Sequence, residues 1–321
     1  MDRSAFDLAE TVRYSGDLKY DSVASSRGVE RLRNIFRHSG LLVSPQITPG
    51  IYSALSDALQ NLGILELTPD AFVYSSPEVN ASCFLGDEAD FIISMSSSLV
   101  TLMKQDELSF VIGHELGHFL LNHSEEILEK DELRTLRVKR AREISADRIG
   151  MIACGSLETA VRAMMKTVSG LPSELIRFDI SYFASQAAAL KEDKFNDYAA
   201  SATHPSILIR TRALINFANY FNGDRFEFLA RKEQLDKMIE ADFRKHIDGC
   251  IVRALELQDR ENEFWRFAAA CLENGKFSKG DQDKVKSEFG DGMLEKLLNL
   301  LRDRPVNEVR EIVSQNLHRF T

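Results

Sequence analysis

The chain has 321 residues, of which 44% are hydrophobic and 28% are charged, proportions that are typical of a globular protein with buried cores. Its formal net charge is −9. This acidic balance argues against a general nucleic-acid-binding protein, which would carry a basic surplus, so we expect no nucleic-acid partner.

The N-terminal residues lack the basic start and the apolar stretch of a signal peptide. No stretch approaches the roughly 18 consecutive apolar residues that a membrane helix needs. The four cysteines are scattered and none pairs with another at metal-ligand spacing, which favours free thiols in a reducing compartment: they are Cys83, Cys154, Cys250 and Cys271. We therefore expect no membrane span and a cytoplasmic location.

Residues 1–65 are predicted to form an N-terminal helical segment that packs on the domain following it. Apolar residues recur at helical spacing in two stretches, 29–36 and 51–62. The stretch 45–50, with its proline and glycine, separates these two candidate helices.

Between residues 70 and 100 the pattern changes to short β-strands. Residues 71–74, 81–85 and 91–95 are apolar and β-prone, and turn-forming residues separate them. The natural interpretation is a small antiparallel sheet.

From Asp106 the helical period returns and carries a metal-binding pattern, His-Glu-Leu-Gly-His at residues 114–118. Residues four apart lie on one face of a helix, so His114 and His118 can direct both imidazoles at one ion. Glu115 is about 100° further round the helix, where it can reach a water molecule beside the ion. This division of roles predicts two zinc ligands and a general base.

A second helix, predicted from about residue 130, supplies the third ligand. Glu143 and Asp147 are four residues apart and share a face. One carboxylate can bind the metal while the other accepts a hydrogen bond from a ligand histidine. Two histidines and one glutamate leave a fourth position for water, which is typical of a catalytic zinc site, with one zinc per chain. His123 is interpreted as a helix-end or packing histidine that faces away from His118.

These motifs, with three further fragments, resemble the M48 family of zinc metallopeptidases. The additional fragments are Asn80-Ala81, the acidic lead-in 106–108, and Thr203-His204-Pro205-Ser206 with the trailing Arg210. The resemblance implies a zincin-like peptidase domain of the gluzincin type over residues 66–222. It also implies that Asn80 and Ala81 open the edge strand that binds substrate.

The resemblance further implies that His204 and Arg210 lie beside the metal. His204 suits a donor to the negative charge that develops on the substrate carbonyl. Arg210 could support a carboxylate ligand or a substrate carbonyl, and Arg212 is the alternative choice for this arginine.

Residues 223–321 are charged and helical in period, and they faintly resemble TerB-like helical domains. The fold class expected for the whole chain is α+β and mostly helical, with this all-helical C-terminal domain as a candidate site for a protein partner. The predicted function is that of a metalloendopeptidase, which hydrolyses protein or peptide substrates with zinc and Glu115. The alternative is a zinc-stabilised binding or chaperone-like protein with a closed or inactive site.

Overall fold

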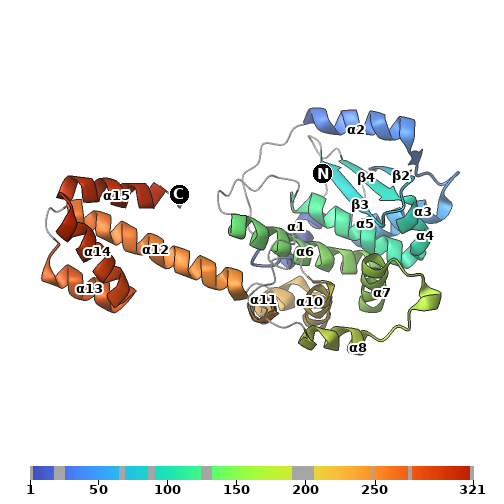
Figure 1. The fold of residues 1–321 in the computed structure, drawn as a ribbon. Helices are drawn as coiled ribbons and strands as arrows, with labels where there is room; N and C mark the ends of the chain where they lie inside the picture. The colour runs from blue at the N-terminus through green and yellow to red at the C-terminus, as the bar shows by residue number, and fades with distance from the viewer. Residues whose placement is uncertain are drawn as a thin grey trace. The chain divides into compact units, whose positions relative to one another are not determined.

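The structure, a computed structural model, describes residues 3–17, 26–64, 69–85, 91–123, 132–189, 206–246, 249–273 and 277–318. These residues form two compact units: the first comprises 1–128 and 136–248, and the second 129–135 and 249–321. Both are rich in helices, and the strands belong to the first unit (Figure 1). The mostly helical α+β class predicted from the sequence is confirmed.

The first half of the first unit carries the sheet and the helices around it. Its elements are α1 (Arg3–Val12), α2 (Ser26–Ser39), β1 (Leu41–Leu42), α3 (Pro49–Asn61), β2 (Asp70–Tyr74), β3 (Ala81–Leu85), β4 (Phe91–Ser96), α4 (Ser97–Leu102) and α5 (Gln105–Leu120). The helices and strands expected between residues 29 and 95 are therefore present, with β1 as an additional short strand.

The second half of this unit is helical. Its elements are α6 (Glu132–Cys154), α7 (Leu157–Ser169), the short 3-10 helices Ser173–Leu175 and Gln186–Ala189, α8 (Ile180–Ser185), α10 (Ile207–Tyr220) and α11 (Arg225–His246). Ser156 begins α7 by accepting a hydrogen bond from the backbone N–H of Thr159, and Gly170 ends it in the left-handed conformation that favours glycine.

The sheet is mixed, whereas the sequence analysis expected an antiparallel one. Its strand order is β1-β2-β4-β3. β3 is antiparallel to β4, but β4 runs parallel to β2 because it returns between β2 and β3 instead of pairing beyond β3. All six residues of β4 are buried, as expected for a central strand. β3 is consequently at the edge of the sheet.

Helices cover both faces of this sheet (Figure 1). On one face α2 packs through Val29 against Phe72 and Ile92. On the other face Phe91 and Ile93 join the main core, to which α3 and α5 contribute. The predicted metal helix α5 thus lies directly beneath the edge strand β3.

The second unit contains α12 (Gly249–Glu273), α13 (Lys279–Phe289), α14 (Asp291–Asp303) and α15 (Val306–His318). A separate apolar core joins these helices, formed by Phe264, Trp265, Ala268, Leu272, Val285, Leu297, Val309 and Val313. In the described part of the chain, no helix combines the length and the apolar character that crossing a membrane requires.

The division between the units does not coincide with the predicted domain boundary at residues 222–223. Helix α11 belongs to the first unit, where Asp236 pairs with the buried guanidinium of Arg148. The phenol of Tyr14 also donates to Glu240 of α11. The domain limits 66–222 and 223–321 stay a prediction.

Candidate metal centre

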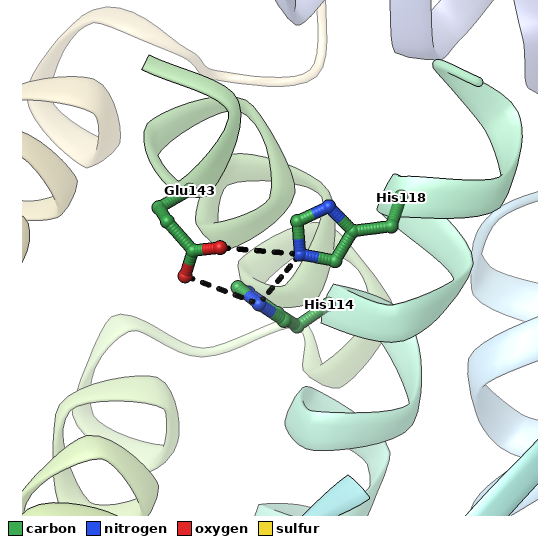
Figure 2. A group of neighbouring side chains, drawn as sticks. All are labelled: His114, His118 and Glu143. Atoms are coloured by element: carbon green, nitrogen blue, oxygen red, sulfur yellow. Dashed lines mark hydrogen bonds and ion pairs between the residues drawn. The ribbon is translucent and has the colours of Figure 1, made fainter. Parts of the chain in front are cut away.

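Three side chains from two helices converge on one point, as Figure 2 shows. Nε2 of His114 lies 3.1 Å from Nε2 of His118. Oxygens of Glu143 lie 3.7 Å from the first of these nitrogens and 3.5 Å from the second. Together they form a cluster of potential metal ligands within the described residues.

The spacing of these three donor atoms fits zinc. Zinc–nitrogen and zinc–oxygen bonds are about 2.0–2.2 Å long, so neighbouring ligand atoms of a tetrahedral site are about 3.3–3.6 Å apart. The observed separations of 3.1, 3.5 and 3.7 Å bracket this range. Two imidazoles and one carboxylate are also a donor combination of catalytic zinc sites.

Small residues let the two ligand-bearing helices approach closely. A Cβ atom added to Gly113 of α5 would lie 2.2 Å from Cβ of Ala153 on α6. One added to Gly117 would lie 3.0 Å from Cα of Ala146. Glu143 can therefore reach the histidines of α5 only because these positions have no side chain.

Asp147 and Arg210 orient His114 through Nδ1, the ring nitrogen that faces away from the cluster. Nδ1 of His114 is 3.0 Å from Asp147, and Arg210 of α10 donates two hydrogen bonds to the same carboxylate, at 2.6 and 2.8 Å. Arg210 also lies 3.1 Å from Glu143. Burial raises the pKa of Asp147, but the charge and hydrogen bonds of Arg210 and His114 outweigh it, so this pKa is lowered and the carboxylate is ionised. An ionised Asp147 accepts the Nδ1 proton and leaves Nε2 of His114 free for a metal.

His118 is held differently, through a second histidine. Its Nδ1 lies 2.8 Å from Nδ1 of His123, and Nε2 of His123 lies 2.9 Å from Asp17. The expectation that His123 faces away from His118 is wrong, because the helix does not continue that far. α5 ends at Leu120, and Asn122 has a positive φ of 56° that turns the chain back toward the site.

Glu115 lies in a cavity of about 540 Å³ beside the three candidate ligands. Burial and the charge of Glu143 raise its pKa above the ordinary value, although His114 and other neighbours oppose this. A carboxylate whose pKa is closer to neutral pH can both take up and release a proton during a reaction.

The cavity also contacts the edge strand β3 and several apolar side chains. Asn80, Ala81, Ser82 and Cys83 line it on the sheet side. Asn80 is anchored to β4, since its N–H donates to Oγ of Ser96 and its carbonyl accepts from the Ser96 N–H. Apolar side chains from four helices complete much of the lining: Leu99, Phe110, Val111, Met164 and Ile207.

Two predictions about neighbouring residues have different outcomes. Arg212, the alternative to Arg210, points elsewhere and forms a paired salt bridge with Asp242, at 2.9 Å for each hydrogen bond. The predicted position of His204 lies outside the described residues. Asp17 was not identified from the sequence as a site residue, and no local pattern connects it with the motif. His123 was noted beside the motif but was interpreted as a helix-end or packing histidine.

Comparisons with known proteins match this chain to metallopeptidases. The model of a family described as peptidase family M48 matches residues 46–134 and 126–218, together more than half of the chain. The chain is 24% identical over 205 residues to the plastoglobule-localized metallopeptidase 48, chloroplastic, of Arabidopsis thaliana, covering 55% of this chain and 59% of that protein.

Shorter matches extend to bacterial proteases. The protease HtpX of Xanthomonas euvesicatoria is 38% identical over 50 residues, which is 16% of this chain and 17% of that protein. The protease HtpX homolog of Helicobacter pylori is 34% identical over 58 residues, or 18% and 19% of the two chains. The matched regions thus span less than two thirds of these relatives.

Proposed function

Because the chain belongs to peptidase family M48, we propose that it is a zinc-dependent peptidase with one zinc ion bound by His114, His118 and Glu143. The observation that carries this proposal is the spacing of the three donor atoms, which matches the edges of a zinc tetrahedron. Zinc bound there would acidify a water molecule and polarise the substrate carbonyl.

The protein's own residues divide the remaining work. Glu115 accepts the proton of the attacking water on its carboxylate and then donates it to the leaving amine nitrogen. Its position in the cavity and its raised pKa support this role. Asp147 and Arg210 act as positioning residues, since they hold His114 and Glu143. His204 stays a predicted donor to the developing oxyanion.

We propose that substrates bind as extended chains along the edge strand β3. Within the described sheet, one side of this strand has no pairing partner, so its backbone groups can hydrogen-bond a peptide regardless of sequence. Asn80 and Ala81 lie where this edge enters the cavity.

We propose that the protein cleaves internal peptide bonds, as an endopeptidase does, and does not act as a carboxypeptidase. Among the described residues that line the cavity, the one permanently cationic side chain is Arg210, and two carboxylates already engage it. No other described cation is therefore available there to hold the terminal carboxylate of a substrate, as a carboxypeptidase requires. Mapping the products of an unfolded protein such as casein tests this, because an endopeptidase releases internal fragments instead of single amino acids.

The experiment that tests the proposed function is the Glu115→Gln variant. It should keep zinc and lose casein cleavage by about 10²–10⁴-fold, because the amide cannot accept the water proton. Undiminished cleavage by this variant would refute the mechanism. Wild-type protein that holds zinc yet cleaves no casein would instead favour the alternative of a zinc-stabilised binding protein.

Three further features stay predictions. The cytoplasmic location rests on the sequence alone, and the plastoglobule in the name of the Arabidopsis relative is said of that protein. Capture of a protein partner by the C-terminal helices, and their similarity to TerB-like domains, likewise stay predictions.

A further inference from the structure

The loop that follows α1 inserts a carboxylate behind the metal centre from a distant part of the sequence. Asp17 accepts a hydrogen bond from Nε2 of His123, at 2.9 Å, and His123 in turn contacts His118, at 2.8 Å between the two Nδ1 atoms. The side chains of Asp17 and His123 are 0% and 3% exposed, so bulk water does not compete for these bonds.

The chemistry of the groups fixes the direction of both hydrogen bonds in the series Asp17–His123–His118. An ionised carboxylate can only accept, so Nε2 of His123 carries the proton that is donated to Asp17. A neutral imidazole has a single N–H, which leaves Nδ1 of His123 as an acceptor. Nδ1 of His118 must then donate to it, and Nε2 of His118 keeps a lone pair. That lone pair faces His114 and Glu143.

We propose that Asp17 and His123 are positioning residues that fix the tautomer and the ring orientation of the ligand His118. This inference rests on the proposed zinc site. It gives each ligand histidine its own support, since Asp147 contacts His114 directly whereas Asp17 reaches His118 through His123. His123 is not itself a ligand, because hydrogen bonds occupy both of its nitrogens.

The loop that carries Asp17 is built to hold this position. Arg13 donates to the carbonyl of Leu121 at 3.0 Å, next to the turn that presents His123. The backbone N–H of Tyr14 donates to Oγ of Ser145 on α6, also at 3.0 Å. These bonds tie the loop to the end of α5 and to α6, the two helices that provide the ligands. They therefore fix the position from which Asp17 contacts His123.

A second set of bonds holds His123 itself. The guanidinium of Arg142 donates to the backbone carbonyl of His123 at 2.9 Å, and the backbone N–H of His123 donates to the carbonyl of His118 at 2.8 Å. With the backbone fixed at both ends, the ring has little freedom to leave His118. This pre-organisation is what a support for a metal ligand requires, because ligand orientation tunes metal affinity.

The test is zinc affinity, measured on the full chain by competition with a chromophoric chelator. His123→Leu and Asp17→Leu should each weaken zinc binding by about 10–100-fold, the usual effect of losing a group that supports a ligand. His123→Asn should bind zinc within about threefold of wild type, because its Oδ1 takes the place of Nδ1 and still accepts from His118. A purely structural role would not distinguish asparagine from leucine in this way.

Tyr14→Phe is the matched control in the same loop, since it removes the hydrogen bond from the Tyr14 phenol to Glu240 and leaves the hydrogen bonds between Asp17, His123 and His118 in place. It should lower the thermal midpoint of the zinc-free protein and leave zinc affinity unchanged. If the leucine variants do not fold, ¹⁵N NMR of the wild-type histidines decides: protonated Nε2 on His123 and protonated Nδ1 on His118 are expected, and the opposite tautomers would overturn the proposal.

The outcomes separate this inference from the proposed function. Wild-type protein that binds no zinc would refute the proposed function. Wild-type protein that binds zinc, with both leucine variants binding equally tightly, would refute the role of Asp17 and His123 alone. Peptidase activity is not needed for either conclusion.

Discussion

The Gly113→Ala substitution should separate the two helices of the metal centre. The new Cβ would lie 2.2 Å from Cβ of Ala153 and 3.1 Å from Cα of Gly150. Non-bonded carbon atoms rest about 3.5–4.0 Å apart, so α5 and α6 would have to separate by about 1.3–1.8 Å at this point. Rotation of a side chain gives no relief, because the opposing atoms belong to an alanine and a glycine.

The cost should appear in both stability and metal binding. Overpacking of this kind destabilises a fold by about 1–3 kcal/mol. The greater helix propensity of alanine offsets roughly 1 kcal/mol of this cost. Metal affinity is more sensitive, because zinc–ligand distances tolerate only about ±0.2 Å. A shift of α6 moves Glu143 away from His114 and His118, so zinc affinity should fall by more than the loss of global stability implies.

Urea unfolding and chelator competition measure these two effects separately. Gly50→Ala provides the matched control, since Gly50 is also helical, in α3, and an added Cβ would have nothing within 4 Å. That variant should be at least as stable as wild type and bind zinc equally well. A Gly113→Ala protein with the stability and the zinc affinity of wild type would refute the close-packing explanation of the site.

Two further substitutions test the buried charges around the centre. Asp236→Ala should cost about 3–5 kcal/mol of unfolding free energy, because it leaves the buried guanidinium of Arg148 without its carboxylate partner. The control is Glu233→Ala, on the exposed face of the same helix, which should not move the urea midpoint. A loss below about 1 kcal/mol for Asp236→Ala would show that Arg148 finds another partner. Arg210→Lys should weaken zinc binding by about 10–100-fold, because lysine cannot donate the paired hydrogen bonds to Asp147; unchanged zinc affinity in the chelator assay would contradict this.

Local pattern was enough to predict the elements that carry the site. Helical periodicity predicted α5 and α6, and the four-residue spacing of His114 and His118 predicted that both rings face one point. The pairing of Glu143 with Asp147 predicted one carboxylate as a metal ligand and one as a hydrogen-bond partner of a ligand histidine. In the structure Glu143 lies beside both imidazoles, and Asp147 contacts Nδ1 of His114. These features depend on geometry within one helix turn, which a sequence encodes directly.

Other features depended on contacts between distant segments. The parallel pairing of β2 with β4 follows from the return of β4 between β2 and β3, and strand patterns alone do not specify that order. Helix α11 likewise belongs to the first unit through contacts between distant segments: Phe228, Leu235, Ile239 and Phe243 join the main core, and Asp236 pairs with Arg148, 88 residues away in the sequence.

The support of His118 shows most clearly what only the tertiary structure decided. Asp17 and His123 are 106 residues apart, and the left-handed turn at Asn122 determines which way His123 points. The sequence by itself predicted the candidate metal ligands, because two of them share a helix face and the third is paired with Asp147 and matches the family's motif. The tertiary structure decided how those ligands are held, because hydrogen bonds across the fold depend on where separate loops and helices meet.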